Sequence, residues 1–125
     1  MIVGIGIDII EISRIERMLD EYGNNFANRV FTDNERAYCE SKARKSMHYG
    51  ARFAAKEAFL KALGTGLVDG IAWRDIEVLN NDAGQPEIRC SGVAKVFADN
   101  LGVARVHLSI SHSKEYAAAI VILEF

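Results

Sequence analysis

Hydrophobic and polar residues alternate along several short stretches of the chain, and this alternation predicts β-strands. The first stretch, residues 2–8, alternates β-branched residues with glycines and ends at Asp8. The glycine face of such a strand admits a neighbour close to its backbone. The other strands predicted in this way cover residues 75–79, 86–90, 104–111 and 115–125.

Other stretches repeat their apolar residues every three to four positions, which is typical of amphipathic helices. The helices predicted by this spacing cover residues 11–22, 32–43, 46–63 and 92–100. Thr32 and Glu35 have the spacing of a capping box, and Gly64 is a residue type that commonly ends a helix. An antiparallel sheet with three to four helices predicts an α+β fold, formed by a single domain over residues 1–125.

The last predicted strand is apolar on both faces and contains an apolar run from Tyr116 to Leu123. Such a strand has to be covered on both sides, by the chain's own helices and a second layer or by another copy of the chain. At 125 residues, we favour another copy. The run is too short for a membrane-spanning helix, which needs ~20 residues, so no membrane association is expected.

The composition is that of a compact globular domain, with 50% hydrophobic and 26% charged residues. Cys39 and Cys90 are too few for a zinc site or a disulfide framework, and no signal peptide precedes Asp8. We therefore expect a cytoplasmic protein. Its formal net charge of −2 does not favour nucleic acid as a partner. Residues 41–61 nevertheless contain six basic residues and one acidic residue, which favours a phosphate-rich ligand.

Three side chains suggest a candidate metal site. Asp8 lies among isoleucines, where a carboxylate needs a donor or a cation, although a helix N-cap is the simpler interpretation. Glu57 and Lys61 are four residues apart, as in an exposed helical salt bridge, but their alanine-rich surroundings indicate a packed surface. Carboxylates from Asp8 and Glu57 would together suit Mg²⁺ completed by waters and substrate phosphates.

Two other motifs are incomplete. Gly4 and Gly6 begin a dinucleotide-binding pattern, but Ile9 stands where its third glycine would fall. The segment from His107 to Ser113 combines histidines and serines without the GxSxG turn of a serine hydrolase. Its polar groups either satisfy turn amides or bind substrate.

Three segments together carry a resemblance that spans the whole chain. They are Gly6-Ile7-Asp8 followed by Arg14-Ile15, then Phe53-Ala54-Ala55-Lys56-Glu57-Ala58-Phe59 with Lys61 and Gly64-Thr65-Gly66, then His107 to Ser113. In this order they resemble the holo-acyl-carrier-protein synthases, the small type of 4'-phosphopantetheinyl transferase. The resemblance implies that family's fold, a Mg²⁺ ion and a homotrimer with active sites at subunit interfaces. It also implies transfer of 4'-phosphopantetheine from coenzyme A to a serine of apo acyl carrier protein, which releases adenosine 3',5'-bisphosphate and activates the carrier for fatty acid biosynthesis.

The resemblance further implies residue roles. Asp8 and Glu57 resemble the metal ligands, and Lys61 resembles the group beside the scissile pyrophosphate. The residues implied to contact coenzyme A are Arg44, Lys45, Arg52, His107 and Gly64. The residues implied to dock the acidic carrier protein are Arg14, Arg17 and Met18. The group that removes the serine proton stays open between Glu57, Asp8 and a metal-bound water.

Two rival classes remain on the sequence alone. A non-catalytic module that binds coenzyme A or a nucleotide would need the basic residues of 41–61 but not both Asp8 and Glu57. A metal-dependent phosphoanhydride hydrolase would need both carboxylates but no docking helix with Arg14 and Arg17.

Overall fold

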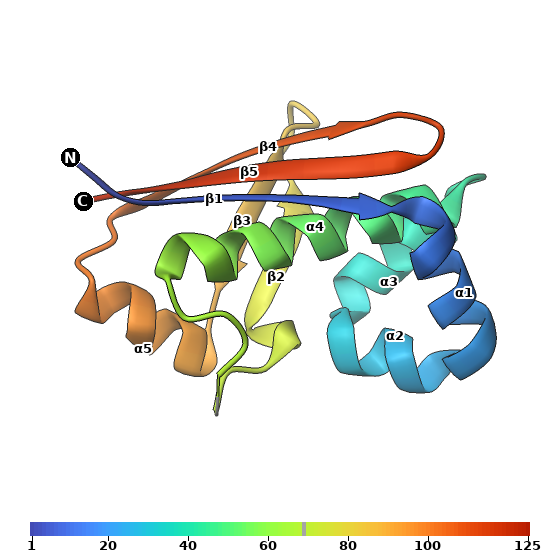
Figure 1. Ribbon diagram of the computed structural model, residues 1–125, viewed down its shortest axis with the longest axis horizontal. Coiled ribbons are helices and arrows are strands. Elements are labelled where there is room, and N and C mark those ends of the chain that lie inside the picture. The colour runs from blue at the N-terminus through green and yellow to red at the C-terminus, as the bar shows by residue number, and fades with distance from the viewer. Residues whose placement is uncertain (69) are drawn as a thin grey trace.

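Three antiparallel strands form the main sheet, in the order β1 (Ile2–Glu11), β5 (Tyr116–Glu124) and β4 (Arg105–His112). The computed structural model describes residues 1–68 and 70–125. Both chain termini lie at the same end of this sheet (Figure 1). The first strand is longer than the sequence predicts, because its pairing with β5 continues from Asp8 to Glu11.

The long helix α4 (Lys45–Leu63) runs along one face of the main sheet (Figure 1). It approaches β1 closely because two glycines of β1 face it: a Cβ atom at Gly4 would clash with the carbonyl oxygen of Ala62, and one at Gly6 with that of Ala58. The predicted role of the glycine face is therefore confirmed. The C-cap Gly64 has a φ of 79°, in the left-handed region that glycine adopts readily.

The remaining elements pack around α4. Strands β2 (Ile76–Asn80) and β3 (Pro86–Cys90) form a separate hairpin, which follows a short 3-10 helix, η1 (Trp73–Asp75). Helix α5 (Gly92–Asn100) lies near the terminal end of the main sheet (Figure 1). The helices at the other end are α1 (Ile12–Tyr22), α2 (Asn24–Val30) and α3 (Asp33–Glu40). The capping box predicted for Thr32 and Glu35 is present at the start of α3.

The expectation of three to four helices is wrong, because the described residues form five α-helices. The missed element is α2, which begins at Asn24, just after the predicted helix over residues 11–22. Its apolar residues decide the outcome: the Phe26 ring lies 6.0 Å from the Phe31 ring in a T-shaped arrangement and 6.5 Å from the Phe53 ring. Packing of this kind stabilises a seven-residue helix that local propensity does not favour.

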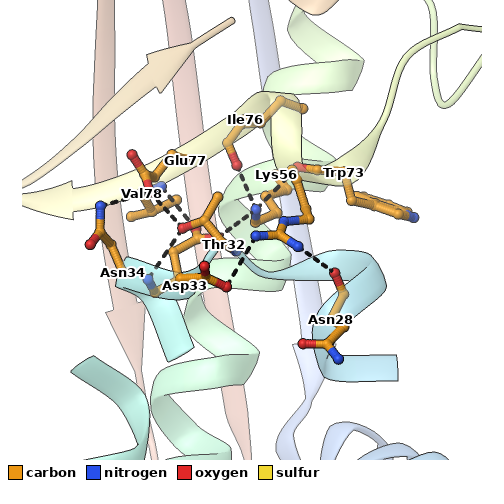
Figure 2. A network of polar contacts seen from close by, with 11 residues as sticks. Asn28, Thr32, Asp33, Asn34, Lys56, Trp73, Ile76, Glu77 and Val78 are labelled. Atoms are coloured by element: carbon orange, nitrogen blue, oxygen red, sulfur yellow. Dashed lines mark hydrogen bonds and ion pairs between the residues drawn. The ribbon is translucent and has the colours of Figure 1, made fainter. Parts of the chain in front are cut away.

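Lys56 lies in the core and not on a basic surface. Its side chain is fully buried and its Nζ atom lies 2.7 Å from Oε1 of the equally buried Glu35. The same ammonium donates to the backbone oxygens of Trp73 and Ile76, as Figure 2 shows. Lys56 therefore joins α4 to α3, η1 and β2, and it has to be removed from the basic residues that the sequence suggested for phosphate binding.

On the face of the main sheet that points away from α4, β1 and β5 are apolar, whereas β4 places His107, Ser109 and Ser111 there. Three isoleucines of β1 on this face, Ile5, Ile7 and Ile9, are 58%, 64% and 66% exposed. Ile7 pairs with Ile120 of β5, which is itself 36% exposed. The chain thus covers the last strand on one side only, within the residues that the structure describes. None of the described helices combines the length and hydropathy needed to cross a membrane.

Candidate active site

Asp8 and Lys61 meet where β1 crosses α4. Asp8 lies on the same face of β1 as Gly4 and Gly6, four and two residues on from them, so its carboxylate points toward the helix. The Lys61 ammonium lies 3.0 Å from Asp8 Oδ1 and donates to the backbone oxygen of Ile7 at 3.1 Å. The Asp8 side chain is only 16% exposed, so this ion pair is shielded from water on the carboxylate side.

Glu57 lies one turn before Lys61 on α4 and is the third candidate side chain of this site. Burial raises the pKa of its half-buried carboxyl, and the nearby charge of Asp8 raises that pKa further. The positive charges of Lys61 and Arg14 act in the opposite direction on the same pKa. The charge of Asp8 thus acts on a Glu57 carboxyl that is only partly exposed to water. The helical Glu57–Lys61 salt bridge considered from the sequence is not formed in the described part of the chain, because Lys61 pairs with Asp8.

The chemistry of these donors fits a hard divalent cation. Two carboxylates that repel one another, one of them with a raised pKa, are stabilised together by a cation between them. Residues 1–68 and 70–125 contain no cluster of three or more acidic, histidine or cysteine side chains that could enclose a metal. A site with two protein carboxylates suits Mg²⁺, which keeps waters and binds substrate phosphates. Asp8 and Glu57 are the residues that would hold it.

The predicted docking residues lie beside this group. Helix α1 begins directly after β1, and the charge of Arg14 is close enough to lower the pKa of Glu57. Arg14 and Arg17 are exposed, whereas Met18 is half-buried against the core. The two arginines thus lie on the helix that follows Asp8's strand, interspersed with the exposed acidic residues Glu16, Asp20 and Glu21.

Arg52 lies elsewhere, although the sequence suggested that it binds the same substrate. It precedes Lys61 by nine residues on α4, which places it about 13 Å away along the axis and roughly half a turn around it. Only 4% of Arg52 is exposed, and its guanidinium carbon lies 4.1 Å from the centre of the Tyr38 ring. Asn80 Oδ1 accepts from Arg52 Nη2 at 3.4 Å, and the buried Nε has no hydrogen-bond partner among the described residues.

Other basic groups surround Arg52. Lys42 Nζ lies 4.7 Å from the centre of the Tyr38 ring, and the His48 ring meets the same ring edge-on at 5.6 Å. Burial lowers the pKa of His48. The charges that lower this pKa further belong to Arg52, Lys42, His112 and Arg44. We call these five residues, Lys42, Arg44, His48, Arg52 and His112, the cationic cluster.

Of the other residues predicted to contact coenzyme A, Arg44 belongs to the cationic cluster, whereas Lys45, His107 and Gly64 lie elsewhere. Arg44 Nη2 donates to the backbone oxygen of Lys114 at 3.0 Å, while Lys45 forms an exposed ion pair with Glu40 at 3.4 Å. His107 Nε2 lies 3.1 Å from Glu124 Oε1 on the main sheet. Gly64 ends α4 one turn after Lys61, and it is the only one of these residues close to Lys61 in sequence.

Two grooves flank these residues. One, of about 730 Å³, lies between the start of α1, the start of α4 and the β4–β5 turn, and its walls include Ser13, Arg44 and Lys114. The second, of about 440 Å³, lies between β3 and β4 and is lined by Pro86 and His107 among others. Neither groove is lined by Asp8, Glu57 or Lys61.

The sequence reasoning missed Tyr38 and Asn80. Tyr38 precedes Lys42 by four residues, a spacing that brings side chains together at a helix end, and this was the available signal. Asn80 ends β2, and nothing in its sequence context points to Arg52. Its contact with Arg52 arises from the packing of the β2–β3 hairpin against α4.

Comparison with known proteins identifies relatives along the entire chain. A family model described as the 4'-phosphopantetheinyl transferase superfamily matches residues 4–121. The chain is 48% identical over 124 residues to a holo-[acyl-carrier-protein] synthase of Geobacter sulfurreducens, covering 99% of this chain and 98% of that protein. It is 50% identical over 124 residues to the synthase of the same name from Trichlorobacter lovleyi, with 99% and 98% coverage.

Solved structures agree with these relatives. The crystal structure of holo-[acyl-carrier-protein] synthase from Neisseria meningitidis matches with a TM-score of 0.92 and 34% identity, covering 100% of both chains. A synthase from Bacillus anthracis, solved in complex with CoA (3',5'-ADP), matches with a TM-score of 0.82 and 48% identity. That match covers 99% of this chain and 97% of the other. The α+β fold predicted from the sequence is therefore confirmed.

Proposed function

The chain belongs to the 4'-phosphopantetheinyl transferase superfamily, and on this basis we propose how its residues act in the reaction of a holo-[acyl-carrier-protein] synthase. It transfers the 4'-phosphopantetheine group of coenzyme A to a serine of an apo acyl carrier protein, releasing adenosine 3',5'-bisphosphate and activating the carrier for fatty acid biosynthesis. Residues 1–125 act as a single transferase domain in this proposal, and a cytoplasmic location stays a prediction.

The observation that carries the proposal is the convergence of Asp8, Glu57 and Lys61. A cation held by the two carboxylates would draw the pyrophosphate of coenzyme A to this place. Mg²⁺, when bound, supplies Lewis-acid polarisation of the phosphoryl oxygens. With Asp8 and Glu57 holding the metal, the exposed Lys61 ammonium would be available to face the substrate.

The transfer itself is an in-line displacement at phosphorus. The serine oxygen of the carrier bonds to the phosphorus of the phosphopantetheine, and the bond from that phosphorus to the bridging oxygen breaks. Lys61 stabilises the negative charge that grows on the leaving phosphate. The serine proton passes to Glu57, Asp8 or a water, and burial and the charge of Asp8 raise the pKa of Glu57 above its ordinary value.

The remaining phosphate of coenzyme A requires a second basic site. Arg52 lies about 13 Å from Lys61 along α4 and on its opposite side, farther than the pyrophosphate and the 3'-phosphate of one coenzyme A lie from each other. We therefore assign Arg52, with Arg44, Lys45 and His107, to a coenzyme A whose pyrophosphate is held by a neighbouring subunit. Gly64, beside Lys61, leaves open space for the pyrophosphate at the end of α4.

A homotrimer places the subunits side by side, as this assignment requires. The exposed face of the main sheet, with Ile5, Ile7 and Ile9 on β1, supplies the apolar surface for the contact between subunits. Helix α1 stays at the edge of each site. There Arg14, Arg17 and Met18 present positive charge and an apolar side chain to the acidic carrier protein.

Mass spectrometry of the carrier protein tests the proposed function. The protein is incubated with coenzyme A, Mg²⁺ and apo acyl carrier protein, and the expected product is the phosphopantetheinyl adduct of the carrier. A parallel reaction without carrier is assayed for adenosine 3',5'-bisphosphate. Release of the bisphosphate without carrier would support a hydrolase, and neither product would support a binding module.

A further inference from the structure

Tyr38 is the meeting point of three basic side chains. Its ring lies under the Arg52 guanidinium at 4.1 Å and under Lys42 Nζ at 4.7 Å, and the His48 ring meets it edge-on at 5.6 Å. An aromatic face attracts cations, and the attraction is strongest where water is excluded, as it is around Arg52. The neutral ring therefore holds together positive charges that would otherwise repel each other.

Asn80 connects Tyr38 to Arg52. Its Nδ2 donates to the Tyr38 hydroxyl at 3.0 Å, while its Oδ1 accepts from Arg52 at 3.4 Å. Both ends of one amide are thus used to fix the ring and the guanidinium relative to each other. Asn80 itself is exposed at the end of β2, so these contacts are made at the surface of the cationic cluster and not in the core.

The cationic cluster lacks a counter-ion. In residues 1–68 and 70–125, none of Lys42, Arg44 and Arg52 lies within 4 Å of a carboxylate oxygen. Arg52 is almost completely buried and its Nε is unpartnered among these residues. A buried guanidinium without an anion is unfavourable, which indicates that an anion completes the arrangement. A phosphate monoester, with its double negative charge, fits a site of this composition.

We propose that Tyr38 and Asn80 are positioning residues that hold Arg52 in place for the 3'-phosphate of coenzyme A, and that they thereby set the preference for coenzyme A over 3'-dephospho-coenzyme A. The inference rests on the proposed function, in which the pyrophosphate is bound near Asp8 and Lys61. The 3'-phosphate is then the one anionic group of coenzyme A left for the cationic cluster.

Steady-state kinetics with the two substrates test this role. Tyr38→Leu removes the ring, and we expect it to raise KM for coenzyme A about tenfold while KM for 3'-dephospho-coenzyme A and kcat hardly change. Tyr38→Phe keeps the ring and should restore KM for coenzyme A to within about twofold of wild type. Asn80→Ala, at an exposed position, should raise the same KM about threefold without a loss of fold. Tyr22→Leu, an exposed tyrosine outside the cluster, is the matched control.

Binding of product gives a second readout that does not need catalysis. Calorimetry should show that Tyr38→Leu and Asn80→Ala weaken adenosine 3',5'-bisphosphate but leave adenosine 5'-phosphate unchanged. Equal increases of KM for both substrates, or no change for either, would overturn the positioning role. A wild-type protein that uses both substrates equally well would also overturn it, yet leave the transferase function standing. Failure of wild type to transfer from either substrate would instead contradict the proposed function.

Discussion

The Lys61 ammonium lies 3.0 Å from the Asp8 carboxylate and pairs with it in preference to Glu57, its neighbour one turn earlier on α4. This contact ties β1 to α4 at the point where the two carboxylates meet. It also leaves Glu57 without a direct ion pair among the described residues and with a raised pKa. In the proposed reaction, this arrangement would place Lys61 beside the pyrophosphate and Glu57 beside a bound cation.

The close approach of β1 and α4 sets the position of Asp8. Gly6→Ala places a methyl group against the Ala58 carbonyl, so we expect β1 to move and stability to fall by about 1–3 kcal/mol, with a loss of transfer activity. Gly50→Ala is the matched control in α4, since its Cβ meets only side chains at 3.7 Å or more. Urea unfolding measures both variants. Equal stability of the two would contradict the proposed close contact.

The buried ion pair between Lys56 and Glu35 is predicted to be structural. Lys56→Met leaves Glu35 charged and unpaired in the core, so the free energy of unfolding should fall by about 3–5 kcal/mol. Lys95→Met, which breaks the exposed pair with Asp99, should cost less than about 1 kcal/mol. Denaturant titration compares them. If both variants lost the same small amount of stability, the buried pair would not be the structural link between α4 and α3.

Glu57 should reduce stability at neutral pH because its folded pKa is raised. Below the ordinary pKa of 4.5, the carboxyl is protonated in both the folded and unfolded states, so it favours neither. Above that value, the unfolded state loses its proton more readily, and the folded state is penalised. Glu57→Gln should therefore raise the melting temperature at pH 7 and lose this advantage near pH 4. If Glu57→Gln melted at a higher temperature than wild type even at pH 4, or at the same temperature as wild type at pH 7, the raised pKa of Glu57 would be contradicted.

The apolar face of the main sheet is predicted to bury Ile7 between subunits. Ile7→Lys places a charge in this contact, so we expect sedimentation to show a trimer for wild type and a monomer for the variant. Val96→Lys, on the exposed side of α5, should leave the trimer intact, since Val96 is 55% exposed outside this face. A monomeric wild type would contradict the proposed assembly.

The sequence predicted the strands well because their patterns are local. The alternation in residues 2–8, the short strand over 86–90 and the apolar terminal strand each depend on neighbours in the chain. The helix α2 could not be predicted in this way, because Phe26 is held by rings from Phe31 and Phe53 that lie outside it.

The candidate site was predicted less completely, for a related physical reason. Asp8, Glu57 and Lys61 were named as candidates, and Lys61 does contact Asp8, but this partner comes from 53 residues away. Lys56 is next to Glu57 in sequence, yet it points into the core toward Glu35. Charge counted along a sequence cannot distinguish these two directions on one helix, because burial depends on what packs against each face.

The central claim is that Asp8 and Glu57 together hold the metal that transfer requires. The most direct measurement is the rate of phosphopantetheinyl adduct formation against Mg²⁺ concentration, by mass spectrometry, for wild type, Asp8→Asn and Glu57→Gln, with circular dichroism to verify folding. We predict that wild type requires Mg²⁺ and that each folded variant is slower by about a hundredfold or more at any Mg²⁺ concentration. A folded Asp8→Asn or Glu57→Gln protein with near wild-type rates in Mg²⁺ would contradict the claim.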